Sequence, residues 1–231
     1  METDFVYWRH HTPVGVKVEE ISGGENRSGA LWTSMAYQVY SENGRDEFRE
    51  IGHFACGAPF LLNSPERISV SHTKNKLVVA TLPPSPDEDL NLFSPATALG
   101  VDVESADRSQ VLKLRERFLS DDELELVAAD DVVANITAWT SKEALYKAGM
   151  GMDPDFRKAI RIGRLPVPAK EEEWLRYISS ADKPDLSEAF GEASLLLPSG
   201  DNLKMNLFSY WSDNDIVTLA YSDQTLRFRT P

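Results

Sequence analysis

The sequence predicts an α+β protein made of two similar halves, each with a helix packed on a small antiparallel sheet and with an active-site cleft between them. Two observations lead to this prediction. A helix-like segment followed by a hairpin-like segment occurs twice, and both helix-like segments contain Trp-Thr-Ser, at 32–34 and 139–141. A proline-rich segment separates the two occurrences, which places an N-terminal half at residues 1–98 and a C-terminal half at residues 99–231.

Hydrophobic spacing predicts the elements of the N-terminal half. The segment over 29–44 carries Leu31, Met35 and Val39 at intervals of four, with Gly44 where a helix would stop, and predicts a helix. Apolar residues alternate with serines from residue 68 before a polar turn and a second apolar run, so 68–80 is predicted to form a hairpin. The segment from Thr81 to Ala98 contains four prolines and three acidic residues and is interpreted as a surface loop, with a lid as the alternative.

The C-terminal half shows clear start and stop signals. We expect a strand over 98–104, helices over 111–118 and 132–148, a helix capped by Ser120 and Glu123, a short helix begun by Asp153 and Pro154, and a hairpin over 205–222. Ser120 and Glu123 form the S-x-x-E pattern of a capping box. Asp153 suits the N-cap position of a helix, and Pro154 suits its first position.

Composition excludes several classes of function. The net charge of −13 disfavours binding to duplex nucleic acid or to an anionic membrane, because both require a basic surface. The single cysteine, Cys56, excludes an internal disulfide framework and a zinc site of the C-x-x-C type. The chain shows no signal-peptide pattern and no apolar run of roughly 20 residues. We therefore expect a soluble cytoplasmic protein.

Carboxylates in two segments are the main candidates for chemistry. Asp102 and Glu104 are two residues apart on a predicted strand, so both side chains leave the same face and need a cation nearby. The alternative is an edge strand with a solvated acidic face. On the long helix, Glu143 and Lys147 lie on one side together with Trp139. The alternative here is an ordinary surface pair, worth about 0.3–0.5 kcal/mol.

If the strand and helix faces meet, Asp102, Glu104 and Glu143 form a site of three carboxylates. Oxygen ligands of this kind suit Mg²⁺ or Mn²⁺. Lys142 and Lys147 would lie beside such a cation, and this combination indicates a substrate that carries phosphate. The natural chemistry is phosphoryl-type transfer, in which a carboxylate takes a proton from the nucleophile and a lysine neutralises the leaving group.

Four short motifs resemble those of a known family. GVDVE at 100–104, followed by WTSKEALYK at 139–147, resembles the paired signature of the 4'-phosphopantetheinyl transferases, in the two-lobed class typified by the surfactin-synthetase activator. Upstream, GAPFLL at 57–62 and ISVSHT at 68–73 resemble the G-x-P and S-H-S/T motifs of that class, in the same order. The resemblance covers roughly residues 57–164.

The resemblance implies a pseudo-twofold α+β enzyme, acting as a monomer. Such an enzyme moves phosphopantetheine from coenzyme A to a serine of an apo acyl or peptidyl carrier protein in fatty acid, polyketide or nonribosomal peptide biosynthesis, and releases adenosine 3',5'-bisphosphate. By resemblance, Asp102, Glu104 and Glu143 hold Mg²⁺ or Mn²⁺. Glu143 helps to deprotonate the serine, directly or through a metal-bound water, and Lys147 stabilises or protonates the leaving phosphate.

The resemblance also implies contacts with coenzyme A. Ser71, His72 and Lys142 are expected to lie near its phosphates, although a lone histidine at the end of a strand is also compatible with a structural role. Ala58 stands where the family commonly has a basic residue. The contact that this basic residue would make with a coenzyme A phosphate is therefore either absent or made by another residue, with Lys74 and Arg49 as candidates.

Two basic segments are candidates for docking an acidic carrier protein, and a solvated helix face is the alternative for each. They are Arg108, Lys113, Arg115 and Arg117, and Arg157, Lys158, Arg161 and Arg164. Two other functions remain as alternatives: another Mg²⁺-dependent phosphate enzyme, such as a hydrolase, and a carrier-binding relative without catalysis.

Overall fold

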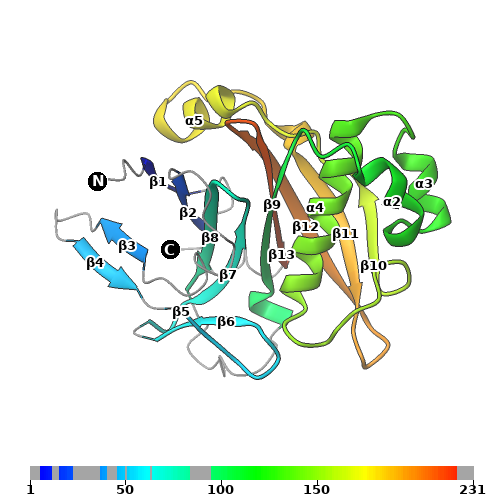
Figure 1. Ribbon diagram of the computed structural model, residues 1–231, viewed down its shortest axis with the longest axis horizontal. Coiled ribbons are helices and arrows are strands. Elements are labelled where there is room, and N and C mark those ends of the chain that lie inside the picture. The colour runs from blue at the N-terminus through cyan, green and yellow to red at the C-terminus, as the bar shows by residue number, and fades with distance from the viewer. Residues whose placement is uncertain are drawn as a thin grey trace.

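Two antiparallel sheets form the framework of the protein (Figure 1). The computed structural model describes residues 6–11, 16–22, 37–40, 46–49, 51–62, 64–83 and 95–222. The first sheet has the order β1-β2-β8-β7, with β1 (Val6–His11), β2 (Lys17–Ser22), β7 (Arg67–His72) and β8 (Lys76–Leu82). The second sheet has the order β10-β11-β12-β13-β9, with β9 (Leu99–Ser105), β10 (Ile160–Arg164), β11 (Phe190–Leu196), β12 (Asn202–Ser212) and β13 (Asp215–Ser222).

Helices and short hairpins cover these sheets. Three helices, α2 (Val111–Phe118), α3 (Asp121–Leu126) and α4 (Val132–Ala148), lie on one face of the second sheet, and α5 (Glu171–Ser179) lies at one end of it (Figure 1). The remaining strands pair in twos: β3 (Tyr37–Tyr40) with β4 (Asp46–Arg49), and β5 (Ile51–His53) with β6 (Pro59–Leu61). Short 3₁₀ turns occur at Pro95–Thr97 and Ser187–Ala189. No helix in the described part of the chain has the length and apolar character needed to cross a bilayer.

The two sheets meet at their edge strands, β7 and β9. Serine side chains of β7 make the connection: the Ser69 hydroxyl accepts the backbone N–H of Val101 at 2.9 Å, and the Ser71 hydroxyl accepts that of Val103 at 3.3 Å. An edge strand presents unpaired N–H groups that need partners when they are buried. The alternating serines of the 68–73 motif therefore join the two sheets.

Alternation along β9 separates core residues from site residues. Val101 and Val103 are buried in a core that both sheets share with Trp174 of α5. Asp102 leaves the opposite face, toward α4, as expected for successive residues of a strand. Gly100 lies against α4, where an added Cβ atom would be 1.8 Å from the backbone oxygen of Ala144. The absence of a side chain at Gly100 allows β9 and α4 to approach closely.

Most expected elements of the C-terminal half are confirmed. The strand over 98–104, the helices over 111–118 and 132–148, and the hairpin over 205–222 correspond to β9, α2, α4 and the β12–β13 pair. The capping box is present, since the Ser120 side chain accepts from the Glu123 backbone and the Glu123 side chain from the Ser120 backbone. In the N-terminal half, the hairpin over 68–80 corresponds to β7 and β8.

Two expected helices are wrong or only partly described. Tyr37–Tyr40 forms strand β3, because its aromatic and β-branched residues suit a strand and pair with β4. The rest of that predicted helix, including Leu31 and Met35, lies outside the described residues. The helix expected after Asp153 is replaced by turns that lead into β10. Asp153 has a φ of 49°, whereas an N-cap residue needs an extended backbone.

Candidate active site

Asp102 is the most enclosed of the three predicted metal ligands. It is 6% exposed, and its Oδ1 atom accepts hydrogen bonds from the Ser71 hydroxyl and from the Lys147 ammonium, both at 2.7 Å. Lys147 also donates to the carbonyl of Val101 at 3.1 Å. Strand β7, strand β9 and helix α4 thus meet at a single carboxylate oxygen.

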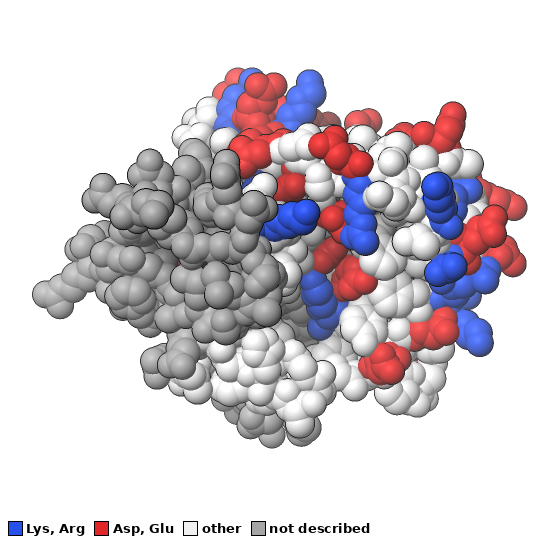
Figure 2. Space-filling model, viewed as in Figure 1, with Lys and Arg blue, Asp and Glu red and all other residues white. Residues whose placement is uncertain are grey.

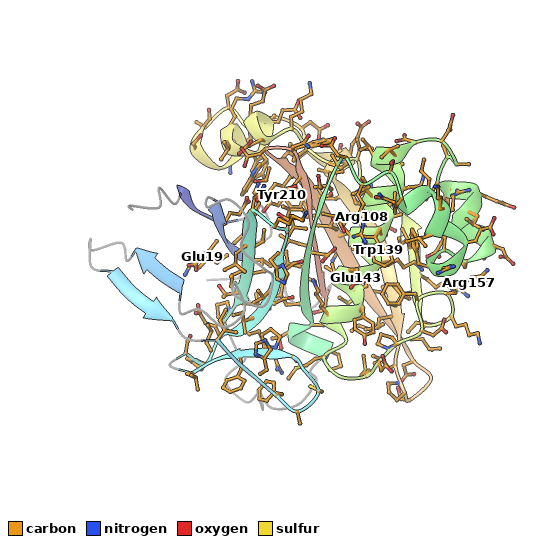
Figure 3. All side chains as sticks on the ribbon, in the orientation of Figure 1. Glu19, Arg108, Trp139, Glu143, Arg157 and Tyr210 are labelled. Atoms are coloured by element: carbon orange, nitrogen blue, oxygen red, sulfur yellow. The ribbon has the colours of Figure 1, made fainter. Side chains whose placement is uncertain are left out.

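Glu104 is paired with an arginine from the turn that follows β9. Its Oε2 atom forms an ion pair with the Arg108 guanidinium, and its Oε1 atom accepts the backbone N–H of Ser105 at 3.2 Å. The Cζ atom of Arg108 lies 6.0 Å from the centre of the Trp139 ring. Figure 3 shows Arg108, Trp139 and Glu143 close to one another along α4. The cation expected beside the acidic face of β9 is therefore present, as an arginine.

Glu143 lies half-buried on α4, within electrostatic reach of the same groups. Burial raises the pKa of Glu143, and the negative charge of Asp102 raises it further, whereas Lys147 and Arg108 act in the opposite direction. The strand face and the helix face thus meet through Asp102 and Lys147, with Glu143 within electrostatic reach of both. The Lys147 ammonium contacts β9 through Asp102, so the lysine acts as more than the helix partner of Glu143.

Lys142 lies in a different place from the one expected by resemblance. It is fully buried, and its Nζ atom donates at 2.7 Å to Glu123 Oε2 and to the carbonyls of Phe156 and Ile160. Burial lowers the pKa of Lys142 to about 8, although the Glu123 carboxylate opposes this. The ammonium joins α3, α4 and β10, so the expected contact with coenzyme A is corrected to a structural role. One helical step of 100° separates Lys142 from Glu143 and turns it toward α3.

The other residues expected to contact coenzyme A occupy varied positions. Ser71 is buried, and its hydroxyl is used by Asp102 and by β9. His72 is half-buried at the end of β7, and Lys74 is exposed in the turn before β8. Arg49 ends β4, and its side chain lies outside the described residues. Of these four, Ser71 is the one seen to contact the carboxylate site.

Two cavities adjoin Lys147 and Glu143. The first, which we name the hairpin cavity, has a volume of about 670 Å³ and lies between the β5–β6 hairpin, β7 and the end of α4; both Ala58 and Lys147 line it. Arg67 also lines it, buried, with Nη1 at 3.0 Å from Met150 Sδ and Nε at 3.5 Å from Thr97 Oγ1. Sequence reasoning did not find Arg67, because a single arginine before a strand carries no distinguishing pattern.

The second cavity, which we name the aromatic cavity, has a volume of about 1160 Å³ and includes Glu143. Its wall contains a run of contacting rings: Phe118 with Trp139 at 5.1 Å between centroids, Trp139 with Phe156 at 6.0 Å, and Tyr146 with Phe156 at 5.4 Å. Four basic residues from both predicted docking segments line it: Arg117, Arg157, Lys158 and Arg161. Figure 2 shows acidic and basic side chains mixed on this side of the molecule.

The basic residues of the first docking segment have different environments in the structure. Arg115 is half-buried and donates to Asn135 Oδ1 at 3.2 Å and to the carbonyl of Leu124 at 3.3 Å. Arg108 is paired with Glu104. Within this segment, Lys113 and Arg117 are exposed on α2. Arg115 therefore stabilises the packing of α2 and α3, and we remove it from the docking candidates.

The carboxylates suit a hard divalent cation in chemistry, although their present arrangement does not form a cation cage. Carboxylate oxygens without Cys or His are the ligands expected for Mg²⁺ or Mn²⁺. Across the described residues, no group of three or more His, Cys, Asp and Glu side chains is arranged to hold a metal ion. Lys147 lies next to Asp102, and Arg108 lies next to Glu104. These two side chains supply the positive charge that a metal cation would otherwise bring to the carboxylates.

Comparison with known families shows which family the segment with these residues is similar to. Residues 98–186 match the family model of the 4'-phosphopantetheinyl transferase superfamily. This part of the chain is similar to the phosphopantetheinyl transferase domain of that superfamily. It contains Asp102, Glu104, Glu143 and Lys147, and it leaves the upstream Ser71 motif outside the match. The superfamily uses coenzyme A, acts on carrier proteins and generally depends on a metal. The comparison with curated proteins gave no match.

Proposed function

We propose that this protein transfers the 4'-phosphopantetheine group of coenzyme A to a serine of an apo acyl or peptidyl carrier protein and releases adenosine 3',5'-bisphosphate. The observation that carries the proposal is the ion pair of Asp102 and Lys147, with Glu143 in electrostatic reach, inside the segment that matches the superfamily and between two cavities. We further propose the two-lobed class, with halves at 1–98 and 99–231 related by a pseudo-twofold axis. Each described sheet draws its strands from one of these halves, which supports this assignment.

The proposed chemistry divides between Glu143 and Lys147. The serine oxygen attacks the β-phosphorus of coenzyme A, a new P–O bond forms, and the bond to the adenosine-side phosphate breaks. Glu143 accepts the serine proton, and its raised pKa makes it a better base near neutral pH than an ordinary carboxylate. Lys147 donates to the departing phosphate. A divalent cation held by Asp102, Glu104 and Glu143 would supply charge neutralisation at the pyrophosphate.

We assign the coenzyme A phosphates to the hairpin cavity. Its described lining includes the cations Lys147 and Arg67, and Ala58 lies in the same wall. Arg67 can therefore provide the positive charge that Ala58 lacks, and its guanidinium geometry suits phosphate oxygens. This proposal replaces Lys74, which is exposed in the β7–β8 turn and does not line the cavity.

We assign the carrier protein to the rim of the aromatic cavity. Arg157 and Arg161 lie on this rim, and both are exposed. Changing both to Glu should raise the KM for the carrier roughly tenfold while the KM for coenzyme A stays the same, because the charges act on the acidic partner. Reversal of Arg176 and Lys204, exposed elsewhere, is the control. An unchanged carrier KM in the Arg157→Glu, Arg161→Glu variant would exclude this docking site.

A mass measurement tests the proposed function directly. An apo carrier protein incubated with this protein, coenzyme A and Mg²⁺ should gain the mass of one phosphopantetheine. Asp102→Ala should abolish the gain, and Glu143→Gln should slow it by roughly 10²- to 10⁴-fold, the usual contribution of a general base. Glu125→Gln, at an exposed carboxylate of α3, is the matched control and should react normally.

Two results of this assay contradict the proposal. The first is no mass gain on fatty-acid, polyketide and peptide-synthetase carriers alike, which would favour a binding relative without catalysis. The second comes from the incubation without any carrier. Release of phosphopantetheine to water in that arm would identify a hydrolase.

A further inference from the structure

Arg108 connects several parts of the carboxylate site. Its guanidinium pairs with Glu104, and its Cζ atom lies 6.0 Å from the centre of the Trp139 ring. Its positive charge also acts on Glu143, whose pKa it lowers against the effect of burial. One arginine therefore contacts a proposed metal ligand and an aromatic ring, and it acts electrostatically on a second proposed ligand (Figure 3).

The protein supplies its own counter-charges to two of the three proposed ligands. Lys147 neutralises Asp102, and Arg108 neutralises Glu104. A divalent cation would bring two more positive charges to the same carboxylates, and like charges at such short range repel each other. Binding of the cation therefore favours departure of one of the resident cations.

Arg108 is the resident cation that is easier to move. Its side chain is 43% exposed, compared with 28% for that of Lys147. Lys147 is held by two acceptors on β9, Asp102 Oδ1 and the Val101 carbonyl. Ion pairs as exposed as that of Arg108 are weak and exchange readily. The guanidinium also lies over the Trp139 ring, within the roughly 6 Å at which an indole face attracts a cation, and this contact does not depend on Glu104.

We propose that Arg108 is a resident counter-ion of the carboxylate cleft, which neutralises Glu104 before a divalent cation binds, and which leaves Glu104 and keeps its contact with Trp139 when the cation takes the carboxylates. This inference rests on the metal centre of the proposed transferase. It explains why these carboxylates are of the kind that binds a divalent cation, although in the described residues they are not arranged around a metal site. Its consequence is that Arg108 lowers the apparent affinity of the cleft for the cation.

Mn²⁺ binding to the full chain, without coenzyme A or carrier protein, tests the proposal. Free Mn²⁺ is measured by electron paramagnetic resonance. Arg108→Gln removes the charge and keeps a polar side chain, and it should bind Mn²⁺ roughly two- to fivefold more tightly than the wild type, as expected when a half-exposed ion pair is removed. Arg176→Gln removes the same charge from exposed α5 and should leave the affinity unchanged. Asp102→Asn should weaken binding and so mark the site.

A second readout follows the movement of the guanidinium. Addition of Mg²⁺ should change the tryptophan fluorescence of the wild type, because the guanidinium over the Trp139 ring loses its partner Glu104 and shifts, and this change should be lost in both Arg108→Gln and Trp139→Phe. An equal response in wild type and Arg108→Gln would overturn the movement.

The outcomes separate this inference from the proposed function. Unchanged or weaker Mn²⁺ binding by Arg108→Gln, together with weakened binding by Asp102→Asn, would overturn the role of Arg108 and leave the metal centre intact. Unchanged binding by Asp102→Asn would overturn the metal centre and the role of Arg108 together. Transferase activity is read from the carrier mass in a separate assay, so its failure is seen independently of Mn²⁺ affinity.

Discussion

Individual residues at the cleft differ mainly in how their charges are compensated. Asp102 receives a hydroxyl and an ammonium hydrogen bond, and Glu104 receives a guanidinium. Glu143 is the carboxylate of the three for which burial and a neighbouring negative charge dominate, and its pKa rises. A carboxylate with a raised pKa is a typical general base, whereas one that is paired with a cation is a typical charged ligand. The environments of these acids thus match the roles that we propose for them.

The raised pKa of Glu143 predicts a pH-dependent contribution to stability. Because its pKa in the folded protein lies above the ordinary value of 4.5, the folded state binds this proton more tightly than the unfolded chain does. The stabilisation is fully present below the ordinary pKa and is lost as pH rises through the raised pKa. Glu143→Gln should remove this loss, so its melting temperature should depend less on pH than that of the wild type.

Melting temperatures of both proteins, measured between about pH 4 and pH 8, check this prediction. Glu125→Gln is the control, because Glu125 is exposed on α3 and outside the cleft. Parallel curves for the wild type and Glu143→Gln would contradict the assignment of a raised pKa to Glu143.

Among the secondary-structure elements, β9 and α4 are the pair whose contact brings the residues of the candidate active site together. Small residues make this contact: Gly100 on the strand, and Ala144 and Ala148, both buried, on the helix. The close approach lets Lys147 of α4 reach Asp102 and the Val101 carbonyl of β9. Packing of the backbone and chemistry of the site therefore depend on the same pair of elements.

Gly100→Ala should destabilise the protein. The added methyl group would lie 1.8 Å from the Ala144 oxygen, so the helix must move away from the strand. Overpacking of this kind costs about 1–3 kcal/mol or more, and the displaced Lys147 should also lower activity. Urea unfolding measures the first effect and the carrier mass assay the second. Gly163→Ala on β10 is the control, since its methyl group would meet its nearest neighbour at an ordinary 3.5 Å. Equal stability of the two variants would contradict the close approach.

In the molecule as a whole, the two sheets share a hydrophobic core and are also joined by polar contacts at two places. Ser69 and Ser71 join β7 to β9 at one of them. At the other, buried Lys76 of β8 donates to the Ser212 carbonyl at 2.7 Å and lies 3.1 Å from Asp213 Oδ2. The Tyr210 hydroxyl of β12 donates to Glu20 of β2 at 2.8 Å. These contacts hold both strands of the β7–β8 hairpin, which carries Ser71, against the second sheet.

Lys76→Met should weaken this second junction. The substitution takes a buried counter-charge away from Glu20, Asp213 and Asp215, and breaking a buried ion pair by removing one partner typically costs about 3–5 kcal/mol. Denaturant unfolding of the full chain measures the loss. Lys74→Met is the matched control two residues away, because Lys74 is exposed and its loss should change stability by less than about 0.5 kcal/mol. Similar stability of the two variants would show that Lys76 does not join the sheets.

Local sequence patterns determined the strand face of Asp102 and Glu104, the helix face of Glu143 and Lys147, the capping box and the two hairpins, because strand and helix periods are properties of neighbouring residues. The same patterns failed for Tyr37–Tyr40 and for the turns after Asp153, where strand pairing and a positive φ override local preference. Strands β10 and β11 carry exposed residues among few buried ones, so their hydrophobic pattern was too weak to predict.

Tertiary structure alone decided which charges meet. Lys142 is one residue from Glu143 in the chain, yet it pairs with Glu123 inside the protein, while Lys147 pairs with Asp102 from another element. Arg108 and Arg67 acquired their positions beside Glu104 and in the hairpin cavity through folding. The physical reason is that periodicity assigns a side chain to a face, whereas its partner depends on packing between segments distant in sequence.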